Sequence, residues 1–439
     1  MRLAVVGAGW AGMAAAVAAA EAGAQVAVFE AAHASGGRAR RLVLHRPDGL
    51  SCTLDNGQHI LIGAYRETLA LMQHVGVPLD QALTPLPLTM AYPDGHGLRT
   101  PDWAATWPAP LDLLAGIVGA RGWTWTDRRA LLATSLRWRR DGFSADAGAT
   151  VADICHGLTA RVIDELIEPL CISALNLPGA QASGAVFLRV LKDALFGPAP
   201  FGVSLAMAAP VRSSTLLLPR QDLSSLLPDA AERWLLERGH TVHLGRRVDA
   251  PVRHNGGWHL GDDPARAPFD RVIWATGAAA AAKGLMTVAP NWARGADALE
   301  HTAITTVYAW APAARLPSPM LALRGGPAQF AFDRGQISPN EPGVQGIMAL
   351  VVSASQGERQ WLQTAAIAQA QTQLGIRLLP LQTVSERRAT FACTPAVRRP
   401  GAEVASGLWA AGDYVDGPYP ATLEGAVRSG QAAVRAALA

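Results

Sequence analysis

The first thirty residues constrain the fold of this chain more than any other stretch. They contain an apolar run over residues 3–6, a set of spaced glycines, an alanine-rich run and a second apolar run that ends at Glu30. The glycines follow the spacing G-x-G-x-x-G and are Gly7, Gly9 and Gly12. A strand, a tight turn, a helix and a second strand in this order predict a βαβ unit whose turn binds the diphosphate of a dinucleotide.

Each of these positions has its own physical role in such a turn. Gly7 permits the sharp turn out of the strand, Gly9 lets backbone N–H groups approach the diphosphate, and Gly12 lets the helix pack against the sheet. Glu30, eighteen residues after Gly12, can accept from ribose hydroxyls and favours a free 2′-OH over a 2′-phosphate. An ordinary βα turn is the plainer reading, which the flanking strand, helix and acid weaken. A cleavable signal peptide needs none of these features, and we reject it.

Length, charge and cysteine content narrow the class of protein. A chain of 439 residues predicts two to three domain-sized masses that can be interleaved. The formal net charge is +3 and the basic residues are scattered, so we expect no nucleic-acid partner. Four cysteines far apart in sequence favour a reduced, cytosolic protein without a structural metal. No apolar run reaches the roughly 20 residues that cross a bilayer, whereas the 13 tryptophans leave attachment to a membrane surface open.

A second pair of glycines, followed by an arginine, comes shortly after the first unit. Gly36 and Gly37 let the backbone fold against a ligand, and the guanidinium of Arg38 can bind phosphate oxygens in a forked geometry. We therefore expect a second contact to the same diphosphate. A plain surface turn is the alternative.

A polar cluster lies between apolar stretches at residues 53–60. The side chains that could take part in binding or catalysis are those of Asp55, Gln58 and His59. Gly57 lies among them. A single histidine is more often structural than catalytic, so both readings of His59 stay open.

The character of the sequence changes between about residues 69 and 212, where segments rich in proline and tryptophan alternate with helical periodicity. We expect an inserted, mostly helical region there. One helical face carries Leu111, Leu114, Ile117 and Val118. Core packing is the plainest role for this face, and lining a pocket or entering a membrane surface are the alternatives.

Further elements of both expected domains follow. Asp222 can cap a single helix, and residues 248–253 form a strand-like segment. Residues 270–277 predict a buried strand that enters a glycine turn, which fits another parallel strand of the first sheet. The span 291–394 alternates strands with one helix over 359–374 and is typical of half of a substrate-domain sheet.

The C-terminal segment contains a second strand-to-turn motif. A strand leads into Gly412 and Asp413, where the acid could meet ribityl or phosphate-side hydroxyls of a ligand. The last helix begins near Thr422 and Leu423, and its free N–H groups and positive dipole end point toward whatever precedes it. Against a reduced flavin ring, this helix would stabilise negative charge at N1 and C2=O.

These motifs together resemble the flavin-containing amine oxidase and phytoene desaturase superfamily over nearly the whole chain. The resemblance rests on the N-terminal glycines with Glu30, on Gly36-Gly37-Arg38, Ala275-Thr276-Gly277, Ala411-Gly412-Asp413 and Thr422-Leu423-Glu424-Gly425. It implies a tightly held FAD. It also implies that the backbone of Val248 holds the adenine and that Gly57, with Gln58, follows the isoalloxazine ring.

Within the superfamily, several sequence segments resemble the hydroxysqualene dehydroxylase subfamily of bacterial hopanoid synthesis. The matching segments are residues 54–59, 174–176, 217–220, 222–223 and 417–424. The resemblance implies an isoprenoid lipid substrate, hydroxysqualene, which is reduced to squalene by hydride from N5 of reduced flavin. Loss of the hydroxyl as water needs a proton donor, for which His59 and Tyr419 are candidates and Glu168 a weaker one. The electron donor that reduces FAD is unidentified.

The expected fold is α/β, with a Rossmann-type FAD-binding domain around a parallel central sheet, interleaved with an α+β substrate domain. We assign residues 1–66, 213–288 and 395–439 to the first domain and 67–212 and 289–394 to the second.

Three other functions stay open on sequence alone. A carotenoid or phytoene-type desaturase would take electrons from a polyene, and an amine oxidase would reduce its flavin with amines. A non-catalytic prenyl-lipid carrier of the same fold, of the Rab escort kind, would need no complete flavin cradle. We expect a cytoplasmic protein and leave peripheral contact with the inner face of the cytoplasmic membrane open.

Overall fold

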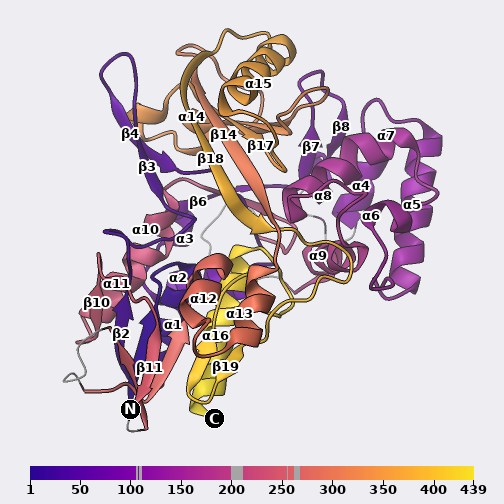
Figure 1. The fold of residues 1–439 in the computed structure, drawn as a ribbon. Helices are drawn as coiled ribbons and strands as arrows, with labels where there is room; N and C mark the ends of the chain where they lie inside the picture. The colour runs from indigo at the N-terminus through magenta and orange to yellow at the C-terminus, as the bar shows by residue number, and fades with distance from the viewer. Residues whose placement is uncertain (105–106, 108–110, 199–210, 255, 262–266) are drawn as a thin grey trace.

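A computed structural model describes residues 1–104, 107, 111–198, 211–254, 256–261 and 267–439. Figure 1 shows three parts: a sheet with its helices at the bottom of the view, a second sheet at the top, and a lobe of helices at the right. Both chain ends lie at the bottom, beside the first sheet.

The first sheet has its N-terminal strand near the centre. Six strands of the described residues lie in the order β10-β2-β1-β13-β20-β19, and all neighbours are parallel except β19 and β20. In that order the strands are Thr241–His243, Gln25–Phe29, Arg2–Val6, Arg271–Trp274, Leu408–Ala410 and Glu403–Ala405. Strands from the two ends of the chain therefore share one sheet, and the parallel strand predicted near residue 272 pairs directly with β1.

Helices cover both faces of this sheet. One face carries α1 (Trp10–Glu21), α11 (Pro228–Leu236) and α16 (Leu423–Leu438), while α12 (Ala278–Leu285) and α13 (Pro290–Asp297) cover the other. The alanine-rich helix α1 lets α16 approach closely. A Cβ atom on Gly430 of α16 would lie 2.2 Å from the carbonyl oxygen of Ala11. The first and last helices thus pack backbone to backbone.

Two expectations about this region need correction. The single helix predicted after Asp222 is two helices, α10 (Leu223–Leu226) and α11, because Pro228 has no N–H to donate and restricts the residue before it. The strand predicted over 248–253 begins only at Pro251, as β11 (Pro251–His254), which pairs with β12 (Gly257–Leu260). Val248 therefore lies in a loop.

The second sheet is antiparallel, in the order β15-β16-β17-β14-β18. These strands are Met320–Ala322, Phe330–Asp333, Ile347–Val352, His301–Trp310 and Leu379–Phe391. Helix α15 (Arg359–Leu374) packs on one face and forms an apolar cluster there, and its predicted bounds are confirmed. The other face packs against the helical lobe.

The remaining elements connect the two sheets and build the lobe. Short strands are β3 (Arg41–His45), β4 (Ser51–Asp55), β5 (Leu61–Ile62), β6 (Leu83–Leu86), β7 (Thr89–Ala91), β8 (Gly97–Arg99) and β9 (Leu216–Pro219). The helices are α2 (Arg66–His74), α3 (Leu79–Ala82), α4 (Leu111–Gly119), α5 (Trp125–Arg140), α6 (Val151–Ile154), α7 (Ala160–Val162), α8 (Glu168–Leu175), α9 (Gly184–Phe196) and α14 (Arg334–Ile337). The architecture is the predicted α/β class, and the domain limits stay a prediction.

Candidate functional site

The N-terminal glycine turn packs too tightly for any side chain. Gly7 has a φ of +109°, and a Cβ atom there would lie 2.7 Å from the carbonyl oxygen of Ala275, at the end of β13. A Cβ atom on Gly12 would lie only 1.8 Å from the carbonyl oxygen of Gly7. The turn is therefore pressed against the neighbouring strand on one side and against the first turn of α1 on the other.

Glu30 faces this turn from the end of β2. One carboxylate oxygen accepts from the N–H of Ala8 at 2.8 Å and the other from the N–H of Ala32 at 2.8 Å. Each oxygen retains a lone pair. The geometry thus leaves Glu30 able to accept from ribose hydroxyls while it holds the glycine turn in place.

The two glycine segments lie against each other. Gly9 and Gly36 form a parallel bridge, and a Cβ atom on Gly37 would lie 3.3 Å from Cα of Gly9. Gly36 and Gly37 have φ values of +124° and +65°, a backbone that favours glycine. Bare backbone from both segments therefore forms one cradle at the N-terminus of α1.

Arg38 joins this cradle to the C-terminal part of the chain. Its guanidinium forms an ion pair with Asp413 and donates to the carbonyl oxygen of Ala389 at 2.8 Å. The Asp413 carboxylate raises the pKa of the Arg38 guanidinium, so the side chain keeps its positive charge. Sequence reasoning placed both residues at the ligand but missed their pairing.

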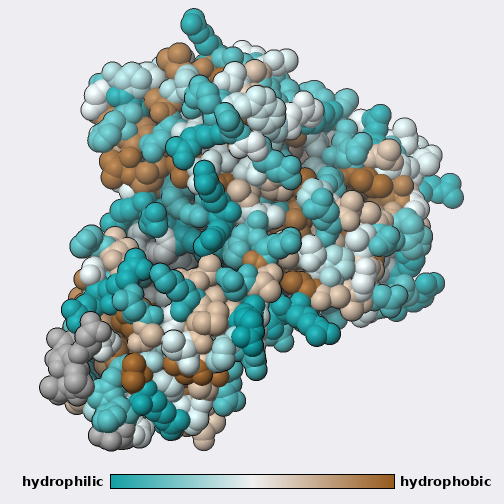
Figure 2. All heavy atoms as spheres, viewed as in Figure 1, coloured by the Kyte–Doolittle hydropathy of each residue, from teal (hydrophilic) through white to brown (hydrophobic). Residues whose placement is uncertain are grey.

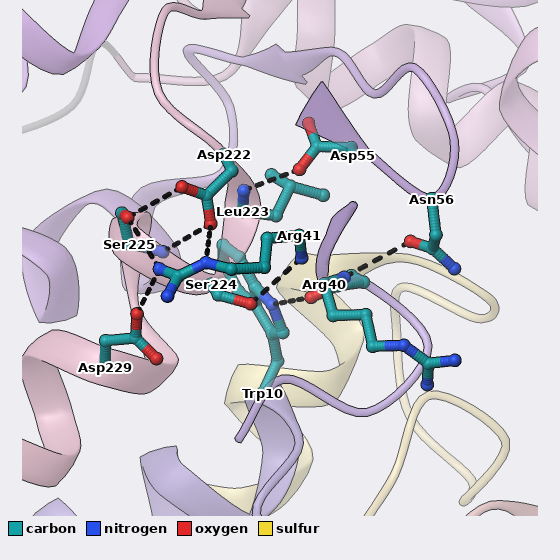
Figure 3. A network of polar contacts seen from close by, with 11 residues as sticks. Trp10, Arg40, Arg41, Asp55, Asn56, Asp222, Leu223, Ser224, Ser225 and Asp229 are labelled. Atoms are coloured by element: carbon teal, nitrogen blue, oxygen red, sulfur yellow. Dashed lines mark hydrogen bonds and ion pairs between the residues drawn. The ribbon is translucent and has the colours of Figure 1, made fainter. Parts of the chain in front are cut away.

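A polar network fastens the strand that follows Arg38 (Figure 3). The guanidinium of Arg41 donates to Asp222 at 3.2 Å and to Ser225 at 3.0 Å, and it forms an ion pair with Asp229. The N–H of Arg41 also donates to the hydroxyl of Ser224 at 3.1 Å. These contacts fix β3 to α10 and α11, and thereby fix the end of the glycine cradle.

The start of α16 is also well anchored. The hydroxyl of Thr422 accepts from the N–H of Gly425 at 2.9 Å and caps the helix, as its position near the predicted start suggested. Glu424 is fully buried, accepts from the N–H of Thr68 at 2.9 Å and pairs with Arg428 at 2.7 Å. Its carboxylate therefore caps α2 as well, a role that sequence reasoning missed. Leu423, half-buried, is the first residue of α16.

The predicted polar cluster bridges the two sheets. Gln58 donates its N–H to the hydroxyl of Thr306 on β14 at 3.3 Å, and its amide oxygen accepts from Arg334 at 3.2 Å. Nδ1 of His59 lies 2.5 Å from the carbonyl oxygen of Gly57. Burial lowers the pKa of the His59 imidazole, which favours the neutral ring with Nδ1 as donor and Nε2 as acceptor. Neither Arg334 nor Thr306 was singled out from the sequence.

Tyr419 and Glu168 are held by other partners. The Tyr419 hydroxyl donates to Asp193 on α9 at 2.7 Å, and Arg428 lies over its ring. Burial and Asp193 raise the pKa of the Tyr419 hydroxyl to about 12, and the ring lines a cavity of about 240 Å³. Both oxygens of Glu168 face the N–H of Gly179, at 3.0 and 3.1 Å. No hydrogen bond among the described residues joins the three candidate proton donors to one another, so their role stays a prediction.

Asp55 carries an unusual carboxyl at the edge of this cluster. It is 3% exposed and accepts from the N–H of Leu223 at 2.7 Å. Burial raises its pKa to about 7, while the Leu223 N–H and the charge of Arg334 oppose the shift. The folded protein therefore binds the Asp55 proton more tightly than the unfolded chain does. The resulting contribution to the free energy of unfolding is fully present below about pH 4 and is lost as the pH rises through 7.

We therefore predict that Asp55→Asn flattens the pH dependence of stability. Asparagine keeps an acceptor for Leu223 and cannot ionise, so up to about 4 kcal/mol of the loss between pH 4 and 8 should disappear, at about 1.4 kcal/mol per pKa unit. Urea unfolding of the holoprotein at pH 4 and 8 measures this. Asp146→Asn, at an exposed site, is the control and should leave the wild-type dependence unchanged. Equal slopes in wild type and Asp55→Asn would contradict the assignment.

The carboxyl ends of the central strands offer unfilled polar groups. The hydroxyls of Thr276, after β13, and Tyr414, after β20, are buried and have no hydrogen-bond partner among the described residues. In parallel sheets, ligands bind at this end of the strands. Together with the bare glycine cradle, Glu30 and the start of α16, these groups fit FAD, whose diphosphate, ribose and ring would occupy them. No group of three or more metal-ligating side chains occurs in the part of the chain that the structure describes.

Known proteins resemble this chain in sequence and in fold. The chain is 28% identical to hydroxysqualene dehydroxylase of Rhodopseudomonas palustris, over 99% of this chain and 98% of that protein. It is 27% identical to hydroxysqualene dehydroxylase of Sinorhizobium fredii, over 99% and 97%. A crystal structure of an oxidoreductase from Methanosarcina mazei has the same fold, with a TM-score of 0.72, 18% identity and coverage of 99% and 100%.

These similarities confirm the resemblance proposed from the motifs and the α/β fold class. The sequence model of the flavin containing amine oxidoreductase family matches residues 10–438, nearly the whole chain. The protein therefore belongs to the flavin-containing amine oxidoreductase family and is an FAD-dependent oxidoreductase.

Proposed function

We propose that the protein reduces hydroxysqualene to squalene. The proposal rests on the similarity to two proteins named hydroxysqualene dehydroxylase. In both comparisons the matched region covers 99% of this chain and at least 97% of the relative. In the reaction the C–O bond of the allylic alcohol breaks, the hydroxyl leaves as water with one added proton, and a C–H bond forms. Reduced FAD, when bound, supplies the hydride for that bond. An external electron donor must then reduce FAD before the next cycle.

The residues of the chain would hold FAD and supply the proton. The glycine cradle with Glu30 would bind the diphosphate and ribose, and the start of α16 would face the ring. Tyr419 is one candidate proton donor: its hydroxyl keeps its proton at neutral pH but donates it to Asp193, so it must exchange that partner for the substrate before it can act. His59 is a second candidate that must first be protonated at Nε2, and Glu168 is a third, already engaged with Gly179.

An anaerobic single-turnover experiment tests the reaction. Photoreduced holoenzyme is mixed with hydroxysqualene, and flavin reoxidation is followed together with squalene by mass spectrometry. We expect one squalene per flavin reoxidised. Reoxidation only after oxygen is admitted, with no squalene, would overturn the proposal. Reduction of the oxidised flavin by phytoene would favour a desaturase, and reduction by amines would favour an amine oxidase.

We also propose that the protein contacts a membrane through one surface of the helical lobe. This surface, the α4 surface, consists of Trp103, Trp107, Leu111, Leu114 and Val118. Their exposed fractions run from 37% for Leu114 to 64% for Trp103, and the two indole rings stack edge to face at 4.9 Å. Neighbouring Ile117 on the same helix is buried, so the helix divides its apolar residues between core and surface. Tryptophan and leucine side chains in this arrangement suit a bilayer interface.

Helix α5, which is joined to the end of α4, carries several basic side chains. Helix α5 exposes Arg129, Arg139 and Arg140, and its one acid, Asp127, is buried as the N-cap partner of Thr124. Arg128 ties α5 to the end of α4 by donating to the carbonyl oxygen of Ala120 at 2.7 Å. Figure 2 shows apolar atoms among hydrophilic ones on this lobe, at the right of the view. Positive charge beside exposed apolar side chains favours an anionic lipid surface. Among the described helices, none is both long and apolar enough to span a bilayer.

The variant Leu111→Gln/Leu114→Gln/Val118→Gln is predicted to lose membrane binding. Each side chain that enters the interface contributes on the order of 1 kcal/mol, so partitioning to phosphatidylglycerol-containing vesicles should fall at least tenfold. Cosedimentation at low and high salt measures this, with Trp361→Gln on α15, 59% exposed, as the control. Equal binding of the triple variant and wild type would exclude the α4 surface.

A further inference from the structure

Arg334 occupies a buried position between the two sheets. It is the first residue of α14, directly after β16, and only 2% exposed. Its Nη1 atom donates to the amide oxygen of Gln58 at 3.2 Å and to the carbonyl oxygen of Pro219 on β9 at 3.0 Å. The side chain therefore reaches from the second sheet to the segment that contains Gly57 and His59.

Most of the hydrogen-bonding capacity of this guanidinium is unused. Its Nε atom is buried without a partner, and Nη2 makes no hydrogen bond with any described residue. Within the described ranges, Arg334 forms no ion pair, although the buried carboxyl of Asp55 lies near enough for the two charges to interact. The adjacent Asp333 instead accepts from the N–H of Leu316 and from Gln336. Three of the five N–H donors of Arg334, the fully buried one on Nε and the two on Nη2, thus have no acceptor among the described residues.

Such an arrangement is costly for a purely structural residue. A buried cation that lacks a partner destabilises the fold by several kcal/mol, and buried donors are nearly always satisfied. Holding Gln58 in place uses Nη1 alone and needs no charge. The free donors and the charge therefore indicate an acceptor that arrives with a ligand.

We infer that Arg334 is a cationic hydrogen-bond donor of the active site, whose free Nε and Nη2 groups bind an electron-rich acceptor atom where the 57–59 segment meets β14. Two sources share this chemistry: the bound flavin in its reduced, negatively charged state, and the hydroxyl of the substrate. If the acceptor is the flavin, the inference requires only that the protein binds FAD. If the acceptor is the substrate hydroxyl, the inference rests on the proposed function.

The first arm of the test measures the midpoint potential of bound FAD in the holoenzyme by dye equilibration. If the cation serves the flavin, Arg334→Met shifts the potential to more negative values, because the reduced ring loses a stabilising charge, and Arg334→Lys recovers most of the shift. Arg220→Met is the matched control: this neighbouring arginine donates to Thr84 and is half-buried. If Arg334→Met yields no flavoprotein, Arg334→Gln, which keeps a donor for Gln58, replaces it.

The second arm compares the binding of hydroxysqualene and squalene to the oxidised holoenzyme. If the cation serves the substrate, Arg334→Met loses at least fivefold of the preference for the alcohol, and the potential stays at the wild-type value. If neither the potential nor the preference differs from Arg220→Met, the inference is wrong and Arg334 only positions Gln58. Should wild type bind neither lipid, the proposed function fails, and the potential alone decides the role of Arg334.

Discussion

Gly12→Ala is expected to abolish the folded flavoprotein. The added Cβ would lie 1.8 Å from the carbonyl oxygen of Gly7 and 3.2 Å from Cβ of Ala275. The first contact is with backbone at the glycine turn, so relief would require α1 to move away from β1 and β13. That movement would open the centre of the sheet and the cradle together, and we expect a loss of more than about 4 kcal/mol of stability.

Gly295→Ala is the matched control, because Gly295 also lies inside a helix, α13. A Cβ atom there would meet nothing within 4 Å, so the substitution should be neutral or stabilise the protein by up to about 1 kcal/mol. Flavin absorbance of the purified proteins and thermal unfolding measure both variants. A Gly12→Ala protein with full FAD content and the wild-type melting temperature would contradict the expected contact.

Local stereochemistry explains which parts of the fold could be predicted from the sequence. The glycine turn is visible because its tightest contact, between Gly12 and the carbonyl oxygen of Gly7, lies within the motif itself. Helix α15 could be bounded because it ends at Gly375, whose φ of +68° suits a helix C-terminus. The break before Pro228 was obscured by the apolar periodicity that continues across it. Periodicity likewise identified the α4 face but not that Ile117 alone of its four residues would be covered.

Pairings across long sequence separations could not be predicted. Arg38 and Asp413 are 375 positions apart, and Arg334 and Gln58 are 276 apart. No local pattern links such residues, since their contact depends on how the two sheets meet. The raised pKa of Asp55 has the same origin, because it results from burial that only the folded chain creates. Motifs thus predicted the residues of the glycine cradle and the C-terminal turn, while the charges that connect them emerged from the fold.

Asp413→Asn is expected to weaken FAD binding by roughly tenfold to a hundredfold, equivalent to about 1.4–3 kcal/mol. Asp413 is buried and forms the ion pair that connects the glycine cradle to the C-terminal motif. Asparagine keeps the size of the side chain but removes the charge, so Arg38 is left with the carbonyl oxygen of Ala389 as its main partner. Titration of the apoprotein with FAD measures the affinity. Asp416→Asn removes a second arginine partner, but there the carboxylate is 71% exposed, and the change should stay within about twofold.

The double variant Arg38→Gln/Asp413→Asn separates two explanations for that loss. If the ion pair acts as a unit that holds the cradle closed, removing both charges should cost little more than removing Asp413 alone. If Arg38 and Asp413 each contact FAD independently, as the sequence motifs suggested, the two losses should add. Additive losses would show that the pairing seen in the structure is replaced by separate contacts once FAD is bound, and a non-additive result would make the pair itself the part of the site that closes it.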